Sequence, residues 1–393
     1  MRTMYLTNEE EKALDGEHGE VVSLAMRILC ALGDFFEADR LIPVQSAHVS
    51  GVSYKTGGEA LLTTLRKFSS MKAKALVPTT LNPGGVDLER WREMGVEEEF
   101  FEKQKKIISF YTDMGILATC SCTPYEAGNL PARGAHVAFA ESSAVAFINS
   151  YLGARTNRES GLSALASAIT GKTPCYGLHV DGNRRPTVKV KVTASLESPT
   201  HYGALGYLIG KNFGDAIPLI QSGRPLPLVE AKHLSSAAAA SGAIALYYWG
   251  EAPGDSDLEK VEVDGRSLAE VFELFGLSEE PEVIVLGCPH YSIHEMRKVA
   301  EMVEGRWVKT PLWIFTSRQV RHLGEQLGLV QKIEQAGGKV FCDTCPIVAP
   351  LKGFRNLLTD SAKAAHYAPS MNKMESALLS TDGCVRVALR GVQ

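Results

Sequence analysis

The C-terminal third of the chain carries the pattern that most restricts its fold, because short apolar segments alternate there with helical ones. The apolar segments EVIVLG at 282–287, PLWIFT at 311–316 and KVFCDTC at 339–345 are separated by a predicted helix that runs through Glu304 and another over 317–336. Strands that alternate with helices form parallel sheets that the helices cover. The chain is therefore predicted to be an α/β protein, in which binding sites form beyond the carboxyl ends of the strands.

Shorter patterns predict helices and strands in the rest of the chain. Thr7 and Glu10 match a capping box, and apolar residues recur at helical spacing from Val21 to Leu32, which predicts an N-terminal amphipathic helix. An alanine run at 237–240 is more typical of close helix packing than of a functional site. The other predicted elements are a strand and polar loop over 41–58, a helix over 97–114, a buried strand over 115–120 and a strand over 186–194.

A chain of 393 residues is too long for one ordinary core, and its length predicts two or three domains. The acidic, polar stretch between Gly250 and Ser278 predicts a boundary or a surface excursion. The expected domains are an N-terminal α/β domain over 1–165 with the SAHVSGVSY loop and Cys122, a middle α/β domain over 166–278, and a C-terminal α/β domain over 279–393 with Cys288 and Cys345.

The composition favours small-molecule chemistry over nucleic-acid binding. Hydrophobic residues make up 45% and charged residues 22% of the chain, as in folded globular proteins, and a formal net charge of -4 is too mild for a nucleic-acid-binding surface. The N-terminal segment TNEEEK lacks the apolar stretch of a signal peptide, and no run is long and uncharged enough to span a bilayer. We therefore expect a cytoplasmic protein with reduced thiols and with no nucleic-acid or membrane partner.

Three of the eight cysteines share a local pattern, in which a predicted apolar strand ends in a cysteine that is followed closely by proline. These are Cys122 in CTPY, Cys288 in CPHY and Cys345 in CPIV. Proline fixes the turn, and a loop at the end of a strand points its side chains toward the crevice, so the three thiols are predicted to converge. Thiolates are the usual ligands of iron–sulfur clusters, and three of them on a four-iron cluster leave one iron open to bind a hydroxyl as a Lewis acid.

The same residues are compatible with other roles. A buried cysteine is commonly a small hydrophobic residue, and Cys342 with Cys345 forms a CxxC typical of a redox dithiol or of half a zinc site. His290 and His294 have the spacing to join such a zinc site. Among the other four cysteines, Cys30 and Cys384 are predicted to be structural. Cys120 and Cys175 fit either role.

Several long segments resemble one protein family. They are LIPVQSAHVSGVSYKTGG, SCTPYEAGN, AESSAVAFINSYLGARTNRESG, VLGCPHYS, DTCPIVAP and SAKAAHYAPS, and together they span nearly the whole chain. These segments resemble the aconitase X family, and within it the archaeal large subunits that act on mevalonate 5-phosphate.

The resemblance implies an aconitase-like fold of several α/β/α domains with parallel-sheet units around a central cluster cleft. It implies that Cys122, Cys288 and Cys345 hold an iron–sulfur cluster, of the 4Fe-4S type with one open iron, and that a separate small subunit with a swivelling domain completes a heterodimer. The implied reaction is the dehydration of mevalonate 5-phosphate to trans-anhydromevalonate 5-phosphate in the modified archaeal mevalonate pathway. The open iron would loosen the hydroxyl, and a base, by resemblance a serine of the small subunit, would take the α-proton.

Substrate contacts are expected from polar residues in three segments. Arginine suits carboxylate or phosphate because its fork donates two parallel hydrogen bonds, so Arg155 and Arg158 are the leading candidates for anion binding, with simple solvation as the alternative. Glu141 needs a partner if it is buried. The expected substrate contacts are Ser46, His48, Ser53, Tyr54, Lys55, Ser142, Ser143, Asn149, Arg155, Asn157, Arg158, Lys363 and His366.

Three other functional hypotheses remain open at this point. The first keeps the fold and the cluster but changes the substrate to cis-3-hydroxy-L-proline, on which bacterial members of the family act. The second is a zinc or CxxC dithiol protein, and the third is a noncatalytic scaffold for the small subunit. Assays with both substrates separate the two dehydratases, and metal analysis of anaerobically purified protein separates iron with sulfide from zinc.

Overall fold

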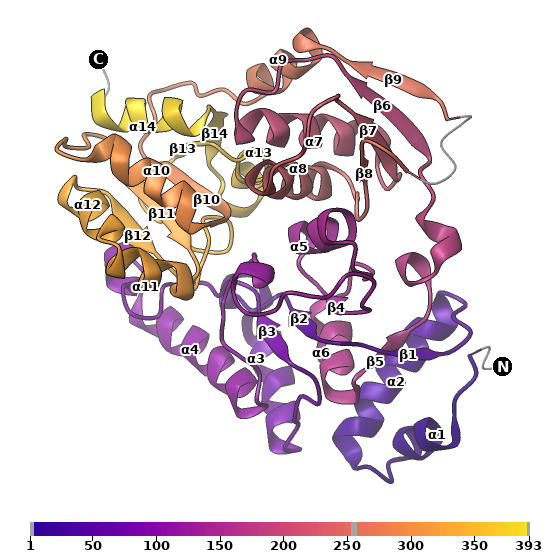
Figure 1. Cartoon of the computed structure of the whole chain (residues 1–393). Coiled ribbons are helices and arrows are strands. Elements are labelled where there is room, and N and C mark those ends of the chain that lie inside the picture. Colours follow the sequence, from indigo (N-terminus) through magenta and orange to yellow (C-terminus); the bar gives the residue numbers. More distant parts are fainter. Residues whose placement is uncertain (1–3, 253–257, 391–393) are drawn as a thin grey trace.

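The computed structural model describes residues 4–252 and 258–390, and within these ranges it contains three parallel sheets with their helices (Figure 1). The sheets follow one another along the chain, so each belongs to its own segment. In Figure 1 the N-terminal segment runs from indigo to magenta, the middle segment from rose to salmon and the C-terminal segment from orange to yellow, with α5 (Ser142–Phe147) between them. The chain is α/β, as its sequence predicts.

The N-terminal segment builds a parallel sheet in the order β3-β2-β4 and an antiparallel pair of β1 with β5. Because these strands are short, most of the core comes from the buried faces of α2, α3, α4 and α6, which share one hydrophobic cluster. Besides α5, the elements of this segment are α1 (Asn8–Asp15), α2 (Glu20–Phe35), α3 (Tyr54–Ser70), α4 (Glu98–Asp113), α6 (Gly161–Thr170), β1 (Leu41–Pro43), β2 (Ala47–Val49), β3 (Thr79–Leu81), β4 (Ala138–Phe139) and β5 (Lys172–Pro174).

The middle segment has a parallel sheet in the order β8-β7-β6-β9 against which α7 and α8 pack. The two helices approach closely, since a Cβ on Gly206 would lie 2.3 Å from the carbonyl oxygen of Leu234, and one on Gly210 would lie 2.5 Å from that of Ala238. This confirms the packing role predicted for the alanine run. The elements are β6 (Val188–Val192), α7 (Pro199–Phe213), β7 (Pro218–Gln221), α8 (Leu228–Ser241), β8 (Tyr248–Trp249), β9 (Lys260–Val263) and α9 (Gly265–Leu274).

The C-terminal segment holds a parallel sheet in the order β12-β11-β10-β13-β14, buried on both faces. Ile284 and Leu286 of β10 pack with α10, α12 and α14, whereas Val285 packs on the other face with Val86 and Trp91 of the N-terminal segment. The elements are β10 (Ile284–Tyr291), α10 (Ile293–Val303), β11 (Leu312–Thr316), α11 (Arg318–Gln326), α12 (Leu329–Gln335), β12 (Lys339–Phe341), β13 (Asn356–Thr359), α13 (Ala362–Tyr367), β14 (Glu375–Leu378) and α14 (Thr381–Arg390).

Three elements differ from the predicted ones, each for a backbone reason. The N-terminal helix is divided into α1 and α2, because Gly16 ends α1 in the left-handed conformation at φ 95°. The helix predicted over 317–336 is interrupted at Gly328, where φ is 71°, and becomes α11 and α12. The strand predicted over 115–120 is wrong, since that segment makes one isolated bridge and Cys120 has a positive φ of 44°.

The predicted domain boundaries stay predictions. The boundary expected at 165/166 falls inside α6, which packs in the N-terminal core together with β5, the partner of β1. In the polar stretch that follows Gly250, residues 253–257 lie outside the described part of the chain, and β9 and α9 occupy much of the rest.

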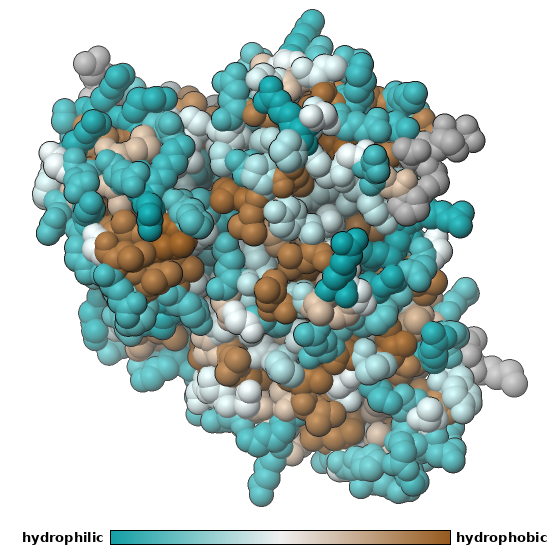
Figure 2. All heavy atoms as spheres, viewed as in Figure 1, coloured by the Kyte–Doolittle hydropathy of each residue, from teal (hydrophilic) through white to brown (hydrophobic). Residues whose placement is uncertain are grey.

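The face shown in Figure 2 is mixed in character. Hydrophobic side chains lie there in several separate patches among hydrophilic ones. In the part of the chain that the structure describes, no helix combines the length and the apolar character needed to cross a membrane.

Candidate functional site

The three cysteines of the proline motifs lie near one another, where the N-terminal segment meets the C-terminal one. Cys288 belongs to β10 and Cys345 follows β12, and both pack in one small cluster with Ile347 and Ala364. Cys122 comes from the loop after α4, and its Sγ accepts a hydrogen bond of 3.2 Å from the backbone N–H of His290. The structure therefore places the three thiols together, but only Cys288 lies in a strand and only Cys345 follows one.

The spacing of the three sulfurs disfavours a single shared zinc ion. In a tetrahedral site with Zn–S bonds of about 2.3 Å, sulfur ligands stand about 3.8 Å apart. Among the described residues, the set of three or more potential ligands whose atoms all lie within 4.8 Å of one another is Asp87, Cys342 and Asp343. The sulfurs of the three motif cysteines do not meet this criterion, so at least one pair of them is more than 4.8 Å apart. In an iron–sulfur cluster each thiolate binds a different iron atom, which keeps the sulfurs farther apart. This donor set fits a cluster.

The three thiols are buried, with exposed fractions of 6% for Cys122, 4% for Cys288 and 8% for Cys345. Burial raises the pKa of Cys122 well above its ordinary value and raises that of Cys288 to about 12, and the ammonium of Lys363 opposes both shifts. Thiols of this kind lose their protons when they bind a metal, and the nearby cation then stabilises the thiolates.

A buried ion pair stands beside the thiols. Lys363 of α13 donates to Glu141 Oε1 and to Ser143 Oγ, each at 2.6 Å, and both members of the Lys363–Glu141 pair are almost fully buried. Glu141 caps α5 by accepting the N–H of Ala144 at 2.6 Å. The structure thus brings Ser143 and Lys363 to the thiols and supplies the partner that a buried Glu141 requires. Ser142 is partly buried at the first position of the same helix.

His48 of β2 lies near enough to Glu141 to feel its charge. It is fully buried, its Nδ1 lies 2.8 Å from Thr80 Oγ1, and its Nε2 makes no close hydrogen bond, although the side chain of Asn82 interacts with the ring. Burial lowers the pKa of His48 to about 4, although the charge of Glu141 opposes this shift, so the imidazole is neutral at pH 7. Ser46, at the entrance of the same strand, also has a buried hydroxyl without a partner.

The first turn of α3 contacts the loop that follows Cys345. Ser53 and Lys55 both donate hydrogen bonds to carbonyl groups in this loop. Tyr54 points elsewhere, since its hydroxyl donates to Glu59 at 2.9 Å and accepts from Lys103 at 3.0 Å on the outer side of the helix.

The other expected substrate contacts are exposed or have partners elsewhere in the protein. Asn149 and Asn157 donate to backbone carbonyls at 2.9 and 3.1 Å, and Arg155 pairs with Asp181. Arg158 is exposed, and the ring of His366 packs against two tyrosines, Tyr207 and Tyr367.

The ligands of the alternative zinc site do not gather. The two ring nitrogens of His290 face Ser121 Oγ at 3.2 Å and the carbonyl of Thr344 at 2.8 Å, whereas His294 is exposed. The thiol of Cys342 lies 3.5 Å from Asp87, in a network whose carboxylates are held by arginines. The two thiols of the CxxC motif, Cys342 and Cys345, therefore lie in different environments.

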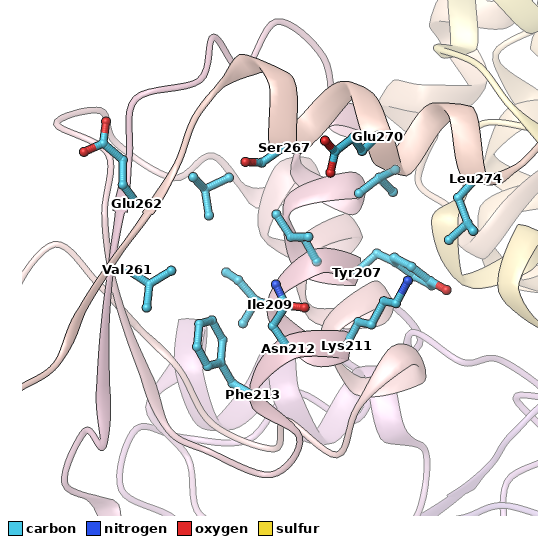
Figure 3. Close-up of a pocket in the computed structure, with 13 residues that line it drawn as sticks. Tyr207, Ile209, Lys211, Asn212, Phe213, Val261, Glu262, Ser267, Glu270 and Leu274 are labelled. Atoms are coloured by element: carbon cyan, nitrogen blue, oxygen red, sulfur yellow. The ribbon is translucent and has the colours of Figure 1, made fainter.

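Sequence reasoning missed a second buried ion pair behind the site. Lys232 of α8 is fully buried and pairs with Glu295 of α10, and it also donates to the carbonyl of His290 at 2.9 Å. The available signal was a lone lysine in a helix rich in alanine and serine. Figure 3 shows a separate cavity of about 310 Å³ between α7, β9 and α9, and none of the expected site residues lines it.

Three family models cover nearly all of the chain. The first, second and third domains of aconitase X match residues 3–182, 186–273 and 281–390. The chain belongs to the aconitase X family. The crystal structure of Thermococcus kodakaraensis aconitase X in its holo-form matches this structure with a TM-score of 0.92 at 44% identity, over 98% of this chain and 100% of the other. The predicted aconitase-like α/β fold is thereby confirmed.

Two groups of relatives have different names. The phosphomevalonate dehydratase large subunit of Methanocaldococcus jannaschii is 44% identical over 95% of this chain and 97% of its own length, and that of Methanothermobacter thermautotrophicus is 46% identical over 94% of each. The cis-3-hydroxy-L-proline dehydratase of Pseudomonas aeruginosa is 33% identical over 97% of this chain but 69% of its own length. Both groups are dehydratases, and the first is nearer in identity and in length.

Proposed function

We propose that this chain is the large subunit of an iron–sulfur hydro-lyase that dehydrates mevalonate 5-phosphate to trans-anhydromevalonate 5-phosphate. The observation that carries the proposal is the meeting of three buried thiols, Cys122, Cys288 and Cys345, beside the Lys363–Glu141 pair. The choice of substrate is supported by four phosphomevalonate dehydratase large subunits that are 44–46% identical, compared with 32–33% for the hydroxyproline dehydratases.

The three thiols would hold the cluster, which when bound supplies a Lewis acid for the departing hydroxyl. The residues of the chain prepare the site around it. Lys363, fixed between Glu141 and Ser143, offers an ammonium group to the carboxylate or phosphate of the substrate. His48 offers a neutral imidazole whose Nε2 makes no close hydrogen bond. Burial of these groups keeps water out, which strengthens each electrostatic contact.

A small subunit completes the proposed enzyme. The two phosphomevalonate dehydratase relatives are named as large subunits, which implies a partner for them, and we extend that partner to this chain as a swivelling domain in a heterodimer. The base that removes the α-proton is proposed to be a serine of that subunit. No residue of this chain is assigned to that step.

An assay with both candidate substrates tests the proposal. The chain is purified anaerobically with the small subunit, and the products formed from mevalonate 5-phosphate and from cis-3-hydroxy-L-proline are measured by mass spectrometry. We expect turnover of mevalonate 5-phosphate and none of hydroxyproline. Turnover of hydroxyproline alone would move the chain to the second group of relatives, and turnover of neither would contradict a dehydratase.

A lysine variant tests the role given to Lys363. Lys363→Met is expected to lose most of the kcat/KM that wild type shows per bound iron, because the substrate anion loses its counter-charge. Lys352→Met is the matched control, since Lys352 is an exposed lysine of the same segment that pairs with Glu97. Equal activity of the two variants would remove Lys363 from the substrate site.

A further inference from the structure

Four successive carbonyl groups in the loop after Cys345 are held by side chains from other elements. The carbonyls belong to residues 346–349. Asn372 Nδ2 donates to the first at 2.8 Å, Lys55 Nζ donates to the second and fourth at 3.1 and 3.0 Å, and Ser53 Oγ donates to the third at 3.0 Å. Every carbonyl of this short loop therefore has a partner outside it.

The donors are themselves fixed. Ser53 is fully buried and caps α3 by accepting the N–H of Lys55 at 3.2 Å. The ammonium of Lys55 also donates to Asn372 Oδ1, so three protein acceptors use all three of its N–H groups. Lys55 is thus committed to the protein, which leaves it no donor for the substrate contact expected from the sequence. Asn372 belongs to the π-helix η6 (Ala368–Asn372), so these hydrogen bonds join the N-terminal segment to two parts of the C-terminal one.

The arrangement has a consequence for Cys345. In a trans peptide the N–H points away from the carbonyl of the preceding residue, so the N–H groups of Ile347 and Val348 point away from Asn372 and Lys55 and interact with the sulfur of Cys345. Ala349 closes the loop by donating its N–H to the Cys345 carbonyl at 3.0 Å. Successive N–H groups that point at one spot form a concave site for an anion, here the thiolate.

We propose that Ser53, Lys55 and Asn372 form a clamp that holds loop 346–349 in the shape that presents Cys345 to the cluster and directs N–H groups at its sulfur. This inference rests on the proposed function, because it takes Cys345 as a cluster ligand. The three residues are positioning residues, which act on the cluster only through the loop. Mutation of a residue that orients a metal ligand typically lowers metal affinity by about 10–100-fold. Hydrogen bonds to the ligand sulfurs also help to set the reduction potential of a cluster.

Three variants test the clamp. Lys55→Met removes the ammonium and keeps most of the side-chain volume, and Asn372→Ala removes two of the hydrogen bonds without changing the charge. Lys67→Met is the matched control, because Lys67 is an exposed lysine of the same helix. Each variant is made in the full chain and purified anaerobically with the small subunit, and circular dichroism checks its folding. If one clamp variant does not fold, the other carries the test.

Two kinds of measurement follow. Hydrogen exchange of the peptide over 345–352, measured in the iron-free form of each protein, reports on the loop without a contribution from the cluster. The rate of iron loss to a chelator and the midpoint potential report on the cluster. In Lys55→Met and Asn372→Ala we expect faster exchange of this peptide, iron loss faster by about tenfold or more and a lower midpoint potential, with Lys67→Met unchanged.

Each outcome decides a different point. Unchanged hydrogen exchange in both clamp variants overturns the clamp itself. Faster exchange with unchanged iron loss and potential overturns its role toward Cys345. A wild-type protein that holds no iron and sulfide overturns the proposed function and with it that role, while the exchange data still decide whether the clamp holds the loop.

Discussion

Replacing Lys232 with methionine tests how much the buried charges behind the site stabilise the fold. The Lys232–Glu295 pair joins the middle segment to the C-terminal one, and the exposed fraction of its side chains is 0% and 10%. Burial alone would raise the pKa of Glu295. The ammonium of Lys232, with His233 beside it, outweighs this effect and lowers the pKa from 4.5 to about 2. A shift of that size corresponds to about 3 kcal/mol in favour of the ionised carboxylate.

The expected loss of stability in Lys232→Met is about 3–5 kcal/mol, because the variant leaves the buried Glu295 carboxylate with only the imidazole of His233 beside it. Urea unfolding of the purified chain, followed by circular dichroism, measures this loss. The double variant Lys232→Met/Glu295→Gln is expected to recover most of it, since no buried charge remains. Lys298→Met, which removes an exposed partner of Asp382 from α10, is expected to cost less than about 1 kcal/mol. If Lys232→Met lowers the free energy of unfolding no more than Lys298→Met does, the buried Lys232–Glu295 pair does not stabilise the fold as proposed.

The same pair predicts a pH dependence with a definite sign. A carboxyl with a lowered pKa stabilises the fold at pH values above its unfolded value of 4.5, and that stability is lost as the pH falls through about 2. In Lys232→Met, Glu295 loses its cation and its folded pKa rises, so the variant is favoured by protonation at low pH. The stability gap between wild type and Lys232→Met should therefore shrink from pH 7 to pH 3. A gap that is constant over this range would contradict the assigned charges.

Three further substitutions have defined outcomes. Gly287→Ala should lower the free energy of unfolding by about 3 kcal/mol or more, measured by urea unfolding, because Gly287 has φ 97° and a Cβ there would lie 2.0 Å from the carbonyl oxygen of Phe315. Glu141→Gln should keep its iron but lower kcat/KM by about a hundredfold in the steady-state assay, because Lys363 loses the partner that fixes it. Cys342→Ser should retain wild-type iron content, and loss of iron there would reassign the ligand within the CxxC.

Much of the fold is predictable because its signals are local. The alternation of apolar and helical segments after residue 282 predicts the parallel sheet, since each strand is short and continuously apolar. The places where prediction fails depend on single backbone conformations. Gly328 divides a helix and Cys120 takes a positive φ where a strand was expected, and neither effect is visible in apolar periodicity.

The site is predictable only in part, because contacts between distant segments decide the rest. The three cysteine–proline motifs single out the thiols that the fold brings together. The partner of Glu141 lies more than 200 positions away in the chain, and the role of Lys55 depends on carbonyls almost 300 positions away. A polar residue in a sequence does not reveal whether its donors are already used by the protein, which is why Lys55 resembled a substrate contact.

The ligand role of the three cysteines is tested most directly by the iron and acid-labile sulfide content of the anaerobically purified chain with its small subunit, together with its absorption spectrum. We expect iron with sulfide in the wild type, loss of both in the serine variants of Cys122, Cys288 and Cys345, and retention in Cys30→Ser. Zinc without sulfide in the wild type, or full retention of iron and sulfide in any of the three ligand variants, would contradict it.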